Sequence, residues 1–145
     1  MQRTDIDPRW QDLAVIERLV REARTVAVVG LSPDPGRPSH GVARYLQRAG
    51  LRIVPVNPNL TSWEGLEAYA SLADVPTPVD IVDVFRRPEH VPAIARAAVA
   101  AGAGALWLQL GVLSEPGASI AADGGLDVVM DRCLVVEHRE VVGWS

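Results

Sequence analysis

The residues whose types best suit ligand chemistry lie in one loop with the sequence GLSPDPGRPS. Gly30 opens this loop and permits a tight turn with close backbone approach to a ligand. Ser32, Arg37 and Ser39 offer hydroxyl and guanidinium donors, which suit phosphate oxygens. The next glycine is Gly36, so the loop is longer than the G-x-G-x-x-G turn of dinucleotide-binding proteins. We therefore expect a bulkier or more highly phosphorylated ligand; the alternative is that the prolines only stiffen an ordinary loop.

The elements that flank this loop would direct it toward a phosphate. Residues 25–29, TVAVV, are small, apolar or β-branched and predict a buried parallel strand that ends at Gly30. A helix is expected from Ser39, its predicted N-cap, to Gly50. Its buried face repeats at helical spacing, through Val42, Leu46 and Ala49. A strand, a glycine turn and a helix N-terminus together are typical of an anion site, because free backbone N–H groups meet the positive end of the helix dipole there.

A second group of candidate residues follows a later apolar run. Residues 79–85, VDIVDVF, predict a strand that ends at Phe85 and is followed by Arg86, and Pro88 begins the next helix. If this strand lies beside the first one, Arg86 and the arginine after it join Arg37 around one cleft. Several cations suit several phosphate groups. The alternative for Phe85 is a place in the core.

The end of the second predicted strand bears on which nucleotide is bound. Residues 51–56, LRIVPV, predict a strand that ends at Val56, and Asn57 and Pro58 follow it. In a nicotinamide-dinucleotide fold this place usually holds an Asp or Glu for the adenosine ribose. Asn57 brings no such charge, which speaks against NAD and leaves NADP or another ribose-phosphorylated nucleotide open. The alternative is a turn without a ligand role.

Strand and helix patterns alternate along the chain. Further strands are expected at residues 67–70, 105–109 and 126–130, and further helices begin near Asp7, Pro88 and Ser114. The first helix should bury one apolar stripe, formed by Leu13, Ile16, Leu19 and Val20. This alternation predicts an α/β fold of Rossmann-like type, a doubly wound parallel sheet in the order 3-2-1-4-5-6 with helices on both faces and an extra N-terminal helix. We expect one domain over residues 1–145.

Composition narrows the classes of function. The net charge of −4 and the pI near 5.3 argue against a general nucleic-acid or acidic-membrane binder, because such binding depends on summed positive charge. A single cysteine excludes an internal disulfide. Residues 1–5 show no signal-peptide pattern, and no apolar run reaches the roughly 18 residues of a membrane span. We therefore expect a cytoplasmic protein.

Other reactive side chains give weaker signals. The three histidines, His40, His90 and His138, are far apart and have no metal-ligand spacing. The nucleophile pattern G-x-S-x-G does not occur, so hydrolase chemistry is not indicated. Cys133 follows the last predicted strand at its carboxyl end, which is the ligand side of the sheet. We interpret it as a buried structural thiol, with contact to a ligand thiol as the alternative.

Five blocks of the sequence together resemble a known family. They occur in the order VGLSPDPGRPSHGVARYL, PVNPN, DIVDVFRRPEHVP, ALWLQLGV and GLDVVMDRCLVVEH. The likeness is to the small single-domain CoA-binding proteins of bacteria and archaea, which are similar to the N-terminal nucleotide domain of the succinyl-CoA synthetase α subunit. The synthetase's second domain, which supplies a phosphorylated histidine, has no counterpart in these blocks. Ligase activity by this chain alone is therefore not expected.

This resemblance implies a Rossmann-like site for coenzyme A. It implies phosphate contacts at Ser32, Arg37 and Ser39, adenosine near Val56, Asn57 and Pro58, and a pantetheine arm covered by Phe85, Arg86 and Pro88. The leading hypothesis is a domain that binds CoA or an acyl-CoA without independent catalysis. The alternatives are an NADP-dependent reductase, a non-catalytic subunit of an acyl-CoA ligase or transferase, and a regulatory module. The last two require a protein partner, which the sequence does not identify.

Overall fold

The computed structural model describes residues 6–143 and contains one parallel five-stranded sheet. The expectation about a leader segment at residues 1–5 lies outside the described residues. The strands run in the order β2-β1-β5-β6-β7, with bounds β1 Thr25–Val29, β2 Arg52–Val56, β5 Ile81–Val84, β6 Ala105–Leu108 and β7 Asp127–Met130. Each of these strands is an almost continuous run of buried apolar residues, as a parallel sheet covered on both faces requires.

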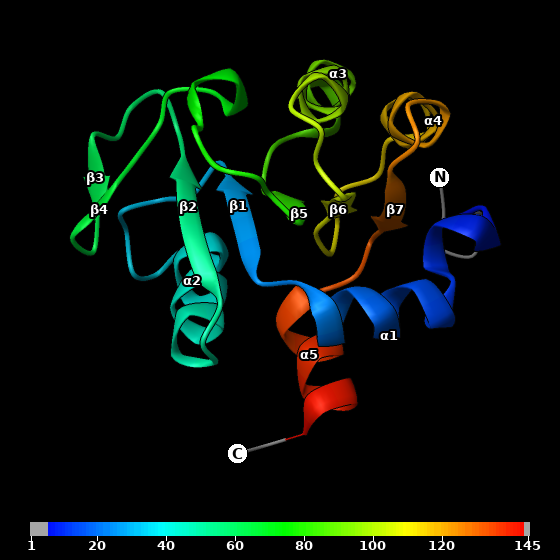
Figure 1. Ribbon diagram of the computed structural model, residues 1–145, viewed down its shortest axis with the longest axis horizontal. Helices are drawn as coiled ribbons and strands as arrows, with labels where there is room; N and C mark the ends of the chain where they lie inside the picture. The colour runs from blue at the N-terminus through cyan, green and yellow to red at the C-terminus, as the bar shows by residue number, and fades with distance from the viewer. Residues whose placement is uncertain (1–5, 144–145) are drawn as a thin grey trace.

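Helices cover the sheet on both faces (Figure 1). On one face lie α3 and α4, and on the other lie α1, α2 and α5. Their bounds are α1 Leu13–Glu22, α2 Pro38–Arg48, α3 Val91–Ala100, α4 Glu115–Asp123 and α5 Leu134–Val142. Short 3-10 helices occur at Pro8–Gln11 (η2), Leu72–Asp74 (η3) and Pro88–His90 (η4). The result is a three-layer α/β fold of Rossmann-like type, as predicted.

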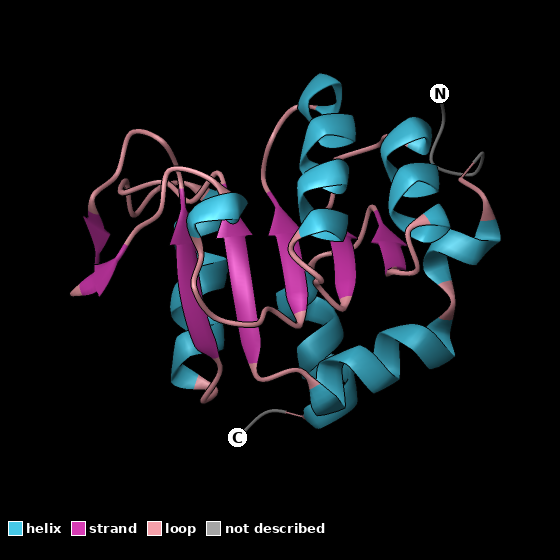
Figure 2. Cartoon of the chain, turned by 45° about the horizontal axis from the view of Figure 1, so that its top comes forward, coloured by secondary structure: helices cyan, strands magenta, loops and turns pink. Residues whose placement is uncertain are grey.

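The sheet has its topological switch point between β1 and β5. The chain leaves β1 through α2 on one face and leaves β5 through α3 on the opposite face. The two strands are hydrogen-bonded neighbours, with Val29 in register with Val84. Their next residues, Gly30 and Phe85, therefore lie side by side at the sheet edge where a ligand crevice forms in open α/β sheets. Figure 2 shows this edge, at which all five arrowheads point the same way.

The predicted third strand is wrong as a member of the sheet. Only Tyr69 reaches the outer edge of the sheet, through an isolated parallel bridge to Val56. The preceding residues form a separate antiparallel hairpin, β3 Ser62–Trp63 and β4 Leu66–Glu67. Glu64 and Gly65 both have positive φ in its turn, so this segment folds back on itself and leaves too few residues to extend along β2. The six-stranded order 3-2-1-4-5-6 is thus corrected to five strands.

The N-terminal helix is also interrupted where one helix was expected. Asp7 caps the 3-10 helix η2, and Asp12 then caps α1 through its carboxylate, which accepts hydrogen bonds from the N–H groups of Ala14 and Val15. An Asp at this point competes with a continuing helix because its side chain satisfies the first N–H groups of a new one. Leu13 consequently lies 66% exposed outside the predicted stripe, whereas Ile16, Leu19 and Val20 are buried. Within residues 6–143, no helix has the length and apolar character needed to cross a membrane.

The middle strand β5 buries one carboxyl group. Asp83 is completely buried, in register with Val28 and Trp107, and its side chain lies on the sheet face covered by α1, α2 and α5. Neither of its carboxylate oxygens has a hydrogen-bond partner within the described part of the chain. Burial in these apolar surroundings raises the pKa of Asp83 well above its ordinary value of 3.8.

Asp83 is expected to make the protein less stable as the pH rises. Above pH 3.8 the unfolded chain releases this proton while the folded chain keeps it, so unfolding is favoured by up to about 1.4 kcal/mol per pH unit until the folded-state pKa is reached. The Asp83→Asn variant has no ionisable group at this position, so its unfolding free energy lacks this pH dependence. Urea titrations from about pH 5 to about pH 7 should show the unfolding free energy of the wild type falling relative to that of the variant. A constant difference across this range would contradict the assignment of a neutral buried carboxyl.

Candidate functional site

A cavity of about 570 Å³ lies at the carboxyl ends of the strands, between the N-termini of α2 and α5. Its walls come from four segments that are distant in sequence: the loop after β1, the segment after β5, the loop after β6 and the start of α5. Seven of the predicted site residues line it, namely Gly30, Ser32, Arg37, Ser39, Phe85, Arg86 and Pro88. The structure therefore brings together residues that the sequence placed at two separate strand ends.

Gly30 occupies the point where the backbone must pass closest to the neighbouring strand. Its φ is +87°, a left-handed conformation that favours glycine. A Cβ atom at this position would lie 2.5 Å from the carbonyl oxygen of Phe85. Its N–H donates to the carbonyl of Val56 at 2.9 Å, which extends the pairing of β1 and β2 into the turn. The turn therefore needs a residue without a side chain, which leaves backbone surface open to a ligand.

The loop after Gly30 is held by its own polar groups. The N–H of Ser32 donates to the hydroxyl of Ser39 at 3.0 Å, and the hydroxyl of Ser32 accepts from the N–H of Asp34 at 3.1 Å. Asp34 in turn accepts from the N–H of Gly36. Both serine hydroxyls serve as acceptors in these bonds, so their protons remain available to donate to an oxygen of a ligand.

The start of α2 differs from the prediction. Arg37, not Ser39, is the N-cap residue, and Pro38 takes the first helical position, where its missing N–H and fixed φ suit a helix start. No side chain caps this end of the helix. Ser39 instead lies buried inside the first turn and holds the loop. His40 and Gly41 donate their N–H groups to the carbonyl of Arg37, so the N–H of Ser39 and the positive dipole end of an 11-residue helix remain at the cavity.

Three arginines give the cavity its charge. Arg37, Arg86 and Arg87 all line it, and none of them forms an ion pair with a carboxylate among residues 6–143. The described lining also includes no Asp or Glu. Arg18, by contrast, lies outside the cavity and forms an ion pair with Asp127. Uncompensated cations beside an uncapped helix N-terminus make this cavity a strong site for an anion.

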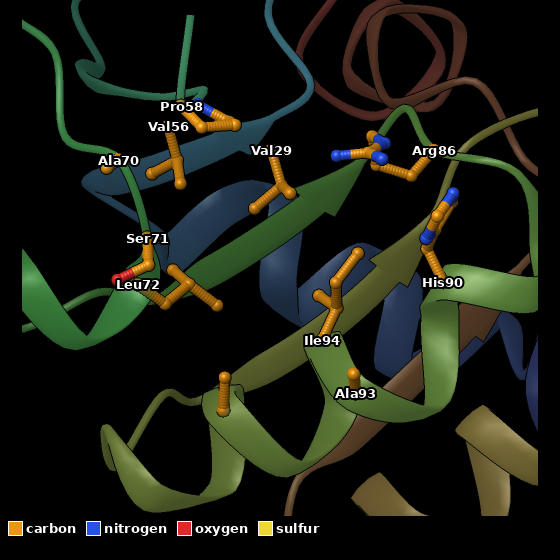
Figure 3. A pocket seen from close by; sticks show the side chains of 11 residues that line it. Val29, Val56, Pro58, Ala70, Ser71, Leu72, Arg86, His90, Ala93 and Ile94 are labelled. Carbon is orange, nitrogen blue, oxygen red and sulfur yellow. The ribbon is translucent and has the colours of Figure 1, made fainter.

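A second, smaller pocket of about 260 Å³ lies beside the first, on the α3 face of the sheet (Figure 3). Val56 and Pro58 of the predicted site line it, together with apolar side chains that include Val29, Leu72 and Ile94. Arg86 lines both pockets, so the two are adjacent across the sheet edge. His90 from η4 stands near Arg86 at the rim. This arrangement offers one mainly apolar compartment and one cationic compartment to a single elongated ligand.

Asn57 lines neither pocket. Its side-chain amide donates to the carbonyl of Leu31 at 2.9 Å, and its oxygen accepts from the N–H of Asn59 at 2.8 Å. The side chain therefore ties the end of β2 to the loop after Gly30. In this structure Asn57 is a positioning residue for the loop, which is the role that a turn-forming Asn favours.

The remaining histidines support the framework. His40 is buried at the start of α2, where its ring receives a hydrogen bond from the indole N–H of Trp63 and faces Glu64. His138 is hydrogen-bonded to the hydroxyl of Tyr45 at 2.9 Å, and burial lowers the pKa of His138. Within the described residues, no cluster of His, Cys, Asp or Glu has the arrangement of a metal site.

Residues 24–139 match the family described as CoA binding domain. The chain belongs to this family. A Bacillus subtilis protein described as "Uncharacterized protein YneT" is 38% identical over 125 residues, which cover 86% of this chain and 93% of that protein. The solved structure of cell-free ID.343 from Thermus thermophilus has a TM-score of 0.84 at 40% identity, with coverage of 90% of this chain and 98% of that one. The resemblance found in the five sequence blocks is thus confirmed at the level of the family.

A more distant match connects the CoA binding domain to larger enzymes. The ADP-forming acetate–CoA ligase II of Archaeoglobus fulgidus is 33% identical over 73 residues, which are 49% of this chain and 11% of the ligase. The present chain therefore corresponds to a small part of that ligase.

Sequence reasoning missed the far end of the large cavity of this CoA binding domain. Gln109 and residues 110–112 line it. Cys133 lines it as well, on the ligand side of the sheet where the sequence placed it, but it is partly exposed and not fully buried as interpreted. The helix α5 that begins after Cys133 was not predicted either. The available signal was Gln109 itself, a polar residue that ends the apolar run ALWL.

Proposed function

We propose that this chain binds coenzyme A, or an acyl-CoA, across the carboxyl ends of its parallel strands. The observation on which this rests most is a set of three arginines, Arg37, Arg86 and Arg87, without an ion-pair partner among residues 6–143, around the Gly30 turn and the start of α2. Coenzyme A carries a pyrophosphate and a ribose 3′-phosphate, and its charge matches a site with several cations and no carboxylate. Membership in the CoA binding domain family supports the same ligand.

The two pockets fit the two ends of such a ligand. The adenine and ribose occupy the smaller pocket, against Val56, Pro58 and Ile94. The pyrophosphate lies over Gly30, beside Arg86, which lines both compartments. The pantetheine arm then extends along the larger cavity past Phe85 and Pro88. Ser32 and Ser39 donate their hydroxyl protons to phosphate oxygens, and Asn57 supports the loop that holds them.

In this proposal the chain retains CoA without catalysing a reaction on its own. Of the described residues that line the large cavity, Cys133 is the one with a nucleophilic thiol, and none is a histidine or a carboxylate able to act as general base. A second candidate role is that of a CoA-carrying subunit of an acyl-CoA ligase or transferase, with catalysis supplied by a partner chain. The partial match to the Archaeoglobus fulgidus ligase favours this second role over a reductase.

Ligand-induced thermal stabilisation tests the proposal. CoA at about 100 times its dissociation constant should stabilise the fold by about 2.7 kcal/mol, which raises the thermal midpoint of a domain of this size by several degrees. NAD should leave the midpoint unchanged, and dephospho-CoA should give an intermediate shift because it lacks the ribose phosphate. A shift with NADP and none with CoA would instead support a reductase.

A further inference from the structure

The far end of the large cavity contains the only cysteine of the chain. Cys133 lines this cavity together with Gln109, opposite the arginines at the other end. It is partly exposed, so a reagent in the cavity can reach its sulfur. In the proposed mode of CoA binding, the terminal part of the pantetheine arm lies at this end of the cavity. This arm ends in a thiol.

Two side chains, one from β6 and one from the residue that follows it, fix the backbone on both sides of Cys133. The indole N–H of Trp107 donates to the carbonyl of Arg132 at 2.8 Å. The amide oxygen of Gln109 accepts from the N–H of Leu134 at 3.4 Å. Because Trp107 is fully buried, these contacts anchor the residues before and after Cys133 to the rigid middle of the sheet. The thiol is thereby held in one place at the cavity wall.

Gln109 supplies a second polar group at this end. Its side chain is 6% exposed, and it lines the cavity. Its oxygen is engaged by Leu134, whereas its NH₂ group has no hydrogen-bond acceptor within residues 6–143. This NH₂ group is not among the buried unpartnered atoms, so it is open to the cavity and can donate to a ligand carbonyl there. The pantetheine arm contains two amide carbonyls.

The dimensions agree with an arm that runs from the phosphates to the thiol of Cys133. Strands in a sheet are about 4.8 Å apart, so the distance from the gap between β1 and β5 to the end of β7 is about 12 Å. The pantetheine arm has a covalent backbone as long as about four amino-acid residues, which spans about 14 Å when extended. An almost extended arm over β6 therefore brings its sulfur to Cys133.

We propose that Cys133 forms a mixed disulfide with coenzyme A by exchange with CoA disulfide, an inference that rests on the proposed CoA site. The Cys133 thiolate attacks one sulfur of CoA disulfide, the S–S bond between the two CoA molecules breaks, and one CoA leaves as a thiolate that takes up a proton. The new bond joins the sulfur of Cys133 to the retained CoA. A thiol that reduces this bond reverses the step, so the site responds to the redox state of the CoA pool.

The position of Cys133 at the start of α5 favours this chemistry. Cys133 is the N-cap residue of the nine-residue helix α5, and its own side chain does not cap the helix, whose first N–H, that of Leu134, donates to Gln109. The positive end of the helix dipole therefore faces the negative charge of an attacking thiolate. In addition, Arg37 and Arg86 can bind the phosphates of CoA disulfide, groups that glutathione disulfide does not contain.

Intact-mass measurement after incubation of the reduced protein with CoA disulfide tests this proposal. The expected product exceeds the mass of the reduced protein by one CoA less two hydrogens, disappears on treatment with dithiothreitol, and is absent from Cys133→Ser. Adduct formation should be at least about tenfold faster with CoA disulfide than with glutathione disulfide, because binding places the reacting sulfurs together. The double variant Arg37→Ala/Arg86→Ala should lose this preference, since it retains the thiol but not the phosphate contacts.

The competing results separate this proposal from the proposed function. Equal rates with the two disulfides would identify a merely accessible thiol and overturn the proposal. A thermal shift with reduced CoA but no adduct would overturn the exchange reaction and leave CoA binding supported. No shift and no adduct would overturn both.

Discussion

Replacing Gly30 by alanine is expected to destabilise the fold by about 2–4 kcal/mol and to abolish CoA binding. The φ of +87° strains any residue with a side chain. The new methyl group would also lie 2.5 Å from the backbone oxygen of Phe85, and backbone in the middle of the sheet edge cannot move away as a flexible side chain does. Urea denaturation and calorimetric titration with CoA on the same samples measure both effects.

Gly41→Ala is the matched control for this substitution. Gly41 lies in α2, is exposed, and has open space where a Cβ would be. Alanine there should stabilise the protein by about 0.5–1 kcal/mol, because it restricts the unfolded chain and favours the helix. Equal stability of the two variants would show that the turn at Gly30 tolerates a side chain and that its close approach to Phe85 is not required.

The double variant Arg37→Ala/Arg86→Ala should bind CoA more weakly by about 3–6 kcal/mol, or roughly 100-fold to 20,000-fold. Each single variant should lose about 1.5–3 kcal/mol, the scale of a charge-assisted hydrogen bond. The two arginines lie on different segments of the cavity wall, so we expect their effects to add approximately. Titration calorimetry at two salt concentrations measures the affinities, and the double variant should show the weaker salt dependence.

Arg96→Ala provides the comparison for this pair. Arg96 is an exposed arginine of α3 that lines neither of the two pockets. Its removal changes the net charge by the same amount as each single variant but should leave the affinity for CoA within error. If Arg96→Ala weakened binding as much as Arg37→Ala, the attraction would come from overall charge and not from contacts in the cavity.

The first βα unit could be predicted from local sequence because local physics determines it. The apolar residues 25–29 are stable as a buried strand because burial removes their side chains from water. Gly30 ends this strand at a point where the backbone needs a positive φ, which favours glycine. The strands at β2, β5, β6 and β7 follow for the same reason, each being a short buried run between turn residues. Alternation of strands and helices then leaves few topologies. Residues at the ends of β1 and β5 were accordingly expected to share one edge.

The tertiary structure alone decided the features that depend on competition between distant segments. Whether residues 67–70 extend the sheet depends on a hairpin turn at Glu64 and Gly65, and the hairpin leaves Tyr69 as a single bridge. Where α2 begins depends on Ser39, which is held by the N–H of Ser32 and so cannot cap the helix.

The composition of the cavity was likewise set by packing. Local pattern could mark Arg37 and Arg86 as candidate ligands, because charged residues after buried strands lie at the ligand side of a parallel sheet. It could not indicate that both have no carboxylate partner within the described residues, since that depends on which acids the fold brings near. It also could not place Gln109 beside Cys133, because the contact joins β6 to a helix 25 residues later in the chain. Long-range contacts of this kind have no signature in local periodicity, and only the folded chain establishes them.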